Sequence, residues 1–207
     1  DVATHEFGHA LGLDHSQNLQ SAMIYTAAAE MSVPSCDDQA GITSFYNTSL
    51  IGRTGSLTGQ ILSPNSAAVF GAHVSAISLE RGVAFASALT ERDGSFRIGG
   101  LEPGNYTITV EPYYPGSGSL GPYYKDMSSA VCQNGTFERT FVPGSTPSSL
   151  KIFSIAANSN SAAGAISVSC SPPKSPFQNA EALAATAPEL AVPNTGGATA
   201  IQSIFTS

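Results

Sequence analysis

The chain has 207 residues, of which 42% are hydrophobic and only 11% are charged, and its formal net charge is −7 at pH 7. This length allows one or two domains with a sizeable core, and the acidic balance argues against nucleic acid and anionic membrane surfaces as partners. No apolar run approaches the roughly 20 residues of a membrane-spanning helix, so no membrane span is expected.

The first predicted element is a helix over residues 1–12, which opens the pattern H-E-x-x-H-x-x-G-x-x-H from His5 to His15. Residues four apart share a helix face, so His5 and His9 can turn imidazole nitrogens toward one metal ion. Gly12 lets the backbone leave the helix through a left-handed turn, which brings His15 back as a third ligand. Three histidine ligands without a nearby cysteine leave one position open, as in catalytic zinc sites.

Glu6 stands beside the first histidine and is not placed as a ligand. Its carboxylate can reach a water on the metal, which is the position that a general base for peptide hydrolysis needs. Two histidines on a helix can also be ordinary surface or core residues, but the eleven-residue pattern is far more specific than two histidines alone. We therefore predict a Zn²⁺ site with His5, His9 and His15 as ligands and Glu6 as the catalytic base.

This pattern resembles the signature of the metzincin metallopeptidases and, because Ser16 directly follows the third histidine, that of the matrixins. Met23 follows His15 at the short matrixin distance, which implies the Met-turn, a hydrophobic turn beneath the metal in that family. The alternative is a core methionine that fills an irregular gap. Tyr25 departs from the matrixin pattern, because Met-x-Tyr is the spacing of astacins and serralysins, whose tyrosine lies near the zinc. Tyr25 is thus a candidate metal-proximal residue, with packing in the turn as the alternative.

A second helix is predicted at residues 37–47, where Asp37 and Asp38 favour a helix start through capping and the helix dipole. The segment from Cys36 onward also resembles the C-terminal helix of matrixins, with its Asp-Asp pair and closing aromatic residue. That resemblance implies that one of the two aspartates ties this helix to the Met-turn. The likeness to matrixins covers roughly residues 1–47.

After a linker at residues 49–55, hydrophobic and polar residues alternate with a period of two. Short strands at this spacing indicate a β-sandwich, in which Asp93-Gly94 is predicted to close a hairpin and Pro103-Gly104 to turn the chain into the next strand. The predicted strands cover residues 57–62, 72–79, 83–90, 95–98, 106–110, 135–142 and 150–155.

The segments at residues 57–61, 71–74, 90–98 and 100–108 resemble the carboxypeptidase regulatory-like domain, a prealbumin-like sandwich often appended to secreted enzymes. We expect no catalytic group of residues there. His73 is a lone histidine in an alternating strand, so it is predicted to lie on a sheet face and not to bind a metal.

Three cysteines, Cys36, Cys132 and Cys170, allow either one disulfide and one thiol or three free thiols. From about residue 156 the chain is rich in Ala, Ser and Pro, with a strand predicted only at residues 165–170. We interpret this last part as a tail or linker.

These features predict a multidomain chain: the C-terminal part of a truncated α+β metzincin catalytic domain at 1–48, a linker at 49–55, an all-β prealbumin-like sandwich at 56–155 and a low-complexity tail at 156–207. The resemblance and the composition imply a secreted zinc metalloendopeptidase acting on protein or peptide substrates, with the oligomeric state open. Because His5 lies only four residues after Asp1, the upper wall of the catalytic cleft is expected upstream, and the chain alone is expected to be inactive. The alternative is an extracellular β-sandwich binding or spacer module with a non-functional protease remnant.

Overall fold

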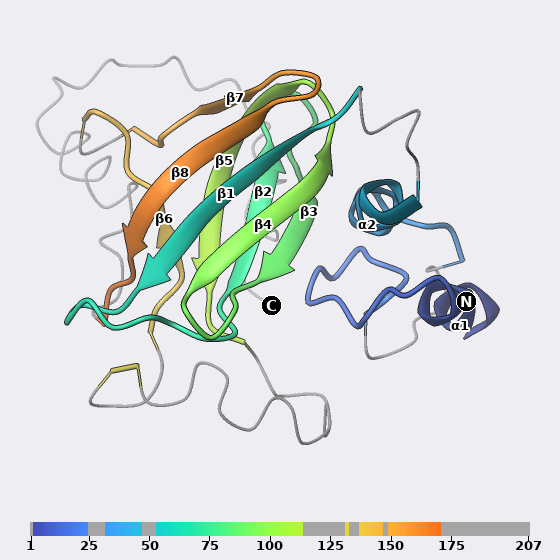
Figure 1. The fold of residues 1–207 in the computed structure, drawn as a ribbon, viewed down its shortest axis with the longest axis horizontal. Coiled ribbons are helices and arrows are strands. Elements are labelled where there is room, and N and C mark those ends of the chain that lie inside the picture. The colour runs from blue at the N-terminus through green and yellow to red at the C-terminus, as the bar shows by residue number, and fades with distance from the viewer. Residues whose placement is uncertain are drawn as a thin grey trace, which may run out of the picture. The chain divides into compact units, whose positions relative to one another are not determined.

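The computed structural model describes residues 2–24, 32–46, 53–113, 131–132, 137–146 and 149–170. Asp1–Pro173 form one compact unit and Lys174–Ser207 a second, and every described residue belongs to the first. Neither described helix is long and apolar enough to cross a membrane. The described elements, drawn in Figure 1, are α1 (Val2–Ala10), α2 (Cys36–Tyr46), β1 (Gly55–Leu62), β2 (His73–Ser78), β3 (Val83–Leu89), β4 (Ser95–Leu101), β5 (Gly104–Glu111), β6 (Thr140–Phe141), β7 (Phe153–Ile155) and β8 (Asn160–Ser167).

Local signals at their ends delimit the two helices. Helix α1 ends before Gly12, which has a φ of 87°, and the Leu13 N–H donates to Gly8 O at 3.0 Å. Helix α2 begins with a reciprocal cap: the Ser35 N–H donates to the Asp38 carboxylate at 2.7 Å, and the Asp38 N–H donates to Ser35 Oγ at 3.3 Å. Such a cap satisfies donors that the first helical turn leaves unpaired.

The strands form two sheets, one with the order β4-β1-β8 and one with the order β3-β2-β5-β6, in which β7 also pairs with β5. Apolar side chains from both sheets are almost fully buried between them. The core includes Leu57, Ile61, Val74, Ile98, Ile108 and Val110. The predicted order of a helical segment followed by a β-sandwich is therefore confirmed, whereas the Met-turn and the low-complexity tail stay predictions.

The Asp93-Gly94 turn does not close a hairpin, so that prediction is wrong. Its residues do turn, because Gly94 has a φ of 79° and the Ser95 N–H donates to Asp93 Oδ1 at 2.9 Å. However, β3 pairs with β2 and β4 pairs with β1, so the turn carries the chain from one sheet to the other. Turn residues specify the reversal of the chain, but they do not specify the strand that becomes the neighbour.

Strand β8 begins at Asn160, five residues before the strand predicted at 165–170, and pairs in parallel with β1. It lies in the range predicted as the tail; the predicted boundaries at residues 48, 55 and 155 otherwise stay predictions. Just beyond β8, Cys170 forms a disulfide with Cys132, and Cys36 is a free thiol. Of the two alternatives for the cysteines, the structure has one disulfide and one thiol.

Candidate functional site

The three histidines of the N-terminal motif lie together. His5 and His9 come from one face of α1, and His15 comes from the loop that follows it. Their ligand atoms all lie within 4.8 Å of one another, and each side chain is half-buried. The ring centroids are 4.7 Å apart for His5 and His9, and 4.8 Å apart for His9 and His15. Among the described residues, no other group of three or more His, Cys, Asp or Glu side chains lies close enough together to hold a metal ion.

Backbone carbonyls orient two of these rings. His5 Nδ1 lies 2.8 Å from Ala22 O, and His9 Nδ1 lies 2.9 Å from Leu13 O. A carbonyl only accepts hydrogen bonds, so in the neutral ring each Nδ1 carries the proton and each Nε2 has the lone pair that can bind a metal. A zinc-binding histidine has this arrangement, with a carbonyl on the far nitrogen. The residues present therefore fit a zinc ion.

His15 and Glu6, the third histidine and the glutamate of the motif, differ in exposure: His15 is half-buried and Glu6 is exposed. Burial, followed by the nearby His9, lowers the pKa of His15, although Asp14 opposes this effect. His15 is therefore neutral at neutral pH, which is the form that binds metals. Glu6 is exposed on α1, and its charge is close enough to His15 to raise that pKa in turn.

Met23 lies under α1. Its side chain is only 2% exposed, and a Cβ atom added to Gly8 would lie 2.1 Å from Met23 Sδ. The Ser16 N–H donates to Met23 O at 2.9 Å, which closes the loop that carries His15. Sequence reasoning missed Gly8, although a glycine inside a helix costs about 1 kcal/mol relative to alanine and therefore calls for a packing reason. Tyr25 lies outside the described residues.

The Asp-Asp pair of α2 contacts this loop through hydrogen bonds. Asp38 is 4% exposed, and its carboxylate accepts hydrogen bonds from the Ser21 hydroxyl and, at 2.8 Å, from the Ala22 N–H. Asp38 thus fixes the residue whose carbonyl orients His5. The Asp37 carboxylate accepts from Ser16 Oγ at 2.6 Å. Burial raises the pKa of Asp37, against the hydrogen bonds that it accepts.

A cavity of about 300 Å³ lies between the His15 loop, α2 and β3. His73, at the start of β2, lines it beside Leu13 and Ser87. His73 is only 5% exposed, and neither of its ring nitrogens has a hydrogen-bond partner. It is not a member of the histidine group described above. Burial, and to a lesser extent Arg139, lowers the pKa of His73 to about 4.

We expect His73 to make the fold less stable in acid. Its pKa is about 4 when folded, against 6.5 for an ordinary histidine. The unfolded chain therefore binds a proton first, and stability is lost as the pH falls from about 6.5 to about 4. This shift corresponds to about 3 kcal/mol. Urea unfolding at a series of pH values should show this loss in the wild type and not in His73→Leu. Parallel curves for the two proteins would contradict the assignment.

Comparisons with known proteins agree with both resemblances. Residues 1–47 match the family model for matrixin, and residues 56–119 match that for the carboxypeptidase regulatory-like domain. Among curated proteins, none matches this chain. The resemblance of the chain to a fusion of these two families is therefore confirmed.

Solved structures that match the chain share little sequence with it. The Bacillus anthracis TIE protein is 14% identical with a TM-score of 0.34, over 57% of this chain and 17% of that one. BcpA, the major pilin subunit of Bacillus cereus, is 14% identical with a TM-score of 0.33, over 57% and 30%. An (S)-allantoin synthase is 18% identical with a TM-score of 0.33, over 63% and 46%. The chain thus spans less than half the length of each of these proteins.

Proposed function

We propose that this chain carries the zinc-binding part of a secreted, matrixin-like metalloendopeptidase that hydrolyses peptide bonds in protein or peptide substrates. The observation that carries the proposal is the convergence of His5, His9 and His15 within 4.8 Å. Two further features support it. Carbonyls on Nδ1 leave Nε2 of His5 and His9 for the metal, and the matrixin match covers the whole motif.

A zinc ion held by these histidines would act as a Lewis acid that polarises the scissile carbonyl and makes a water more acidic. Glu6 directly follows His5 in the motif and is not needed as a ligand. It takes the proton from the attacking water and passes it to the nitrogen of the leaving amine. His5 and His9 are held by Ala22 O and Leu13 O, so their rings need little reorganisation when the metal binds.

Chelation of the full-length natural protein tests this function. We expect it to cleave quenched-fluorescent peptides, to lose that activity with a zinc chelator, and to regain it when Zn²⁺ is added back. The matched control is the same chelator already saturated with zinc, which should leave the rate unchanged. Peptide cleavage that survives chelation would exclude zinc catalysis. A protein that neither holds zinc nor cleaves any peptide would instead favour the spacer module with a protease remnant.

A further inference from the structure

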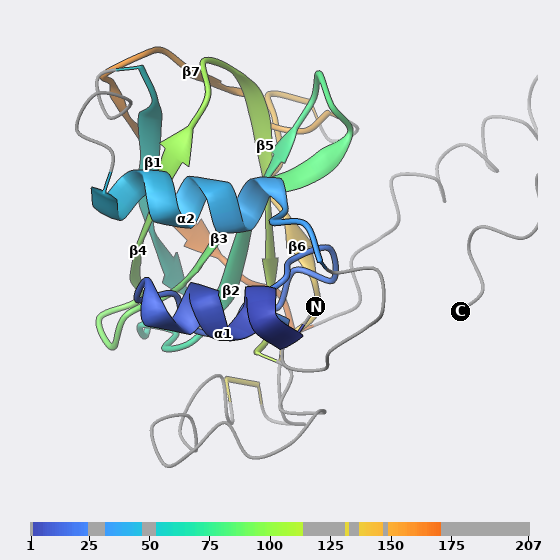
Figure 2. The ribbon, with the colours of Figure 1, turned by 90° about the vertical axis from the view of Figure 1, so that its right-hand side faces the viewer.

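Helix α2 packs on strands β3 and β4 of the sandwich (Figure 2). It also contacts the segment from Gly12 to Ile24 that carries His15, which we call the metal loop. Ala40 of α2 is 3% exposed and belongs to the same buried cluster as the sandwich core. Two successive glycines of β4 make room for it. A Cβ added to Gly100 would lie 2.3 Å from Ala40 O, and one added to Gly99 would lie 3.1 Å from Ser44 Cβ. This packing therefore depends on the absence of side chains at these two positions of β4.

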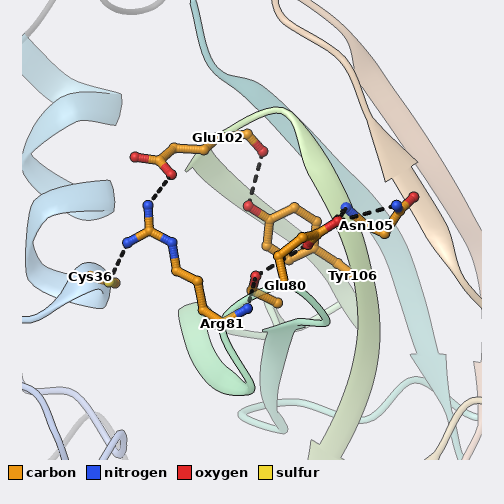
Figure 3. Close-up of polar contacts among 7 residues, drawn as sticks. Cys36, Glu80, Arg81, Glu102, Asn105 and Tyr106 are labelled. Carbon is orange, nitrogen blue, oxygen red and sulfur yellow. Dashed lines mark hydrogen bonds and ion pairs between the residues drawn. The ribbon is translucent and has the colours of Figure 1, made fainter.

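A polar contact holds the N-terminus of the same helix, as Figure 3 shows. Arg81, in the turn between β2 and β3, donates from its guanidinium to Cys36 Sγ at 3.8 Å and forms an ion pair with Glu102. The Tyr106 hydroxyl donates to Glu102 O at 2.9 Å, which fixes the far side of that pair. Arg81 and Glu102 are both exposed, so their ion pair contributes less than the buried contact of Ala40 with β4.

The Asp37 carboxylate bridges the sandwich and the metal loop. One oxygen accepts the Ser87 N–H at 2.6 Å and the Ser87 Oγ–H at 3.0 Å, both from β3. The other oxygen accepts from Ser16 Oγ at 2.6 Å, and Ser16 directly follows His15. One side chain of α2 thus connects the middle of β3 to the residue after the third histidine.

A second connection lies two residues farther along the loop. Asn18 is 7% exposed, and its Nδ2 donates to Ala84 O of β3 at 3.3 Å. The Asn18 N–H donates to Ser16 Oγ at 3.0 Å, so both connections meet at Ser16. On the other side of the loop, Leu13 packs against Gly41 of α2, where an added Cβ would lie 2.9 Å from Leu13 Cδ2.

We propose that the β-sandwich positions the third metal ligand: Ser87 and Ala84 of β3, acting through Asp37 and Asn18, hold the loop that carries His15. This inference rests on the proposed zinc site. Helix α1 places the backbone of His5 and His9, whereas the loop after α1 places the backbone of His15. The sandwich is then a structural part of the metal centre, and Asp37 is a positioning residue that does not touch the metal.

Metal binding by the chain of residues 1–207 tests this inference with Zn²⁺ alone and with Co²⁺ as a spectroscopic probe. Asp37→Asn keeps one acceptor oxygen and cannot accept from both Ser16 and Ser87. We expect it to weaken Zn²⁺ binding by about tenfold or more, as changes beside metal ligands typically do. The visible absorption of bound Co²⁺, which reports ligand geometry, should change as well.

A glycine pair supplies the matched control. Gly100→Ala places a methyl group on the backbone of Ala40, whereas Gly82→Ala has the same φ of 68° with no atom within 4 Å. Both variants carry the same backbone strain, but only the first displaces α2. We therefore expect Gly100→Ala to weaken Zn²⁺ binding and Gly82→Ala to leave it unchanged.

The outcomes separate this inference from the proposed function. If wild type and His9→Ala bind Zn²⁺ equally, or neither binds, the zinc site itself is wrong. If wild type binds, His9→Ala does not, and Asp37→Asn matches wild type in Zn²⁺ affinity and Co²⁺ spectrum, the positioning role is overturned. Should Gly100→Ala unfold the sandwich, as circular dichroism would reveal, Asp37→Asn alone decides.

Discussion

Replacing Glu6 by glutamine is expected to lower peptide hydrolysis by the full-length natural protein by about 10²–10⁴-fold, because general acid–base catalysis contributes that much. The amide has nearly the same shape as the carboxylate but does not take a proton from the attacking water. Glu6 is exposed on α1 and lies outside the histidine group, so its loss should leave zinc bound. The measurement is kcat/KM, together with the zinc content of the same preparation.

Glu91→Gln is the matched control for this experiment, because Glu91 is also exposed but lies in the turn before β4. It should retain wild-type turnover. A Glu6→Gln protein with near-normal turnover would place the base on another residue. A Glu6→Gln protein without zinc would mean that Glu6 helps to hold the metal.

His9→Ala is expected to abolish stoichiometric zinc binding. His9 is the middle member of the group, with its ring centroid 4.7 Å from that of His5 and 4.8 Å from that of His15. Two histidines without the third form a much weaker site for a tetrahedral ion. Elemental analysis after dialysis measures the bound zinc, which should fall from one ion per chain to nearly none.

His73→Leu is the corresponding control, since His73 is the fourth histidine of the chain and lies outside the group. It should keep the zinc of the wild type. If His9→Ala retains all its zinc, or if His73→Leu loses it, the three-histidine assignment is wrong.

Regular local patterns predicted much of the architecture. The spacing of four between His5 and His9 places them on one helix face whatever surrounds them. In strands β1 to β5 hydrophobic and polar residues alternate with a period of two. This pattern is clear in the sequence where the inward-facing residues are large, as at Leu57, Ile61 and Ile108. Strand β8 buries mainly Ala163 and Ile166, so its alternation is too weak to be read.

The contacts between distant segments could not be predicted. An aspartate such as Asp37 is common at the start of any helix, so the sequence does not indicate a distant partner. Its partner Ser87 lies 50 residues later, in a strand with no distinctive motif. In the sequence, Gly99 and Gly100 indicate only that a strand ends or weakens. The helix that fills the space beside them is α2, which lies far away in the chain, so its presence could not be predicted. Long-range complementarity of this kind leaves no periodic trace in a single sequence.

The persistence of the disulfide between Cys132 and Cys170 depends on the redox state of the compartment that holds the protein. Disulfides form and persist in oxidising compartments, and glutathione and thioredoxin keep them rare in the cytosol. In an oxidising environment the segment just after β8 is covalently fastened to residue 132. In a reducing environment this end of the sandwich would keep only non-covalent contacts, among them the pairing of β8 with β1. The disulfide would therefore add to the hold on β8 under oxidising conditions and not under reducing ones.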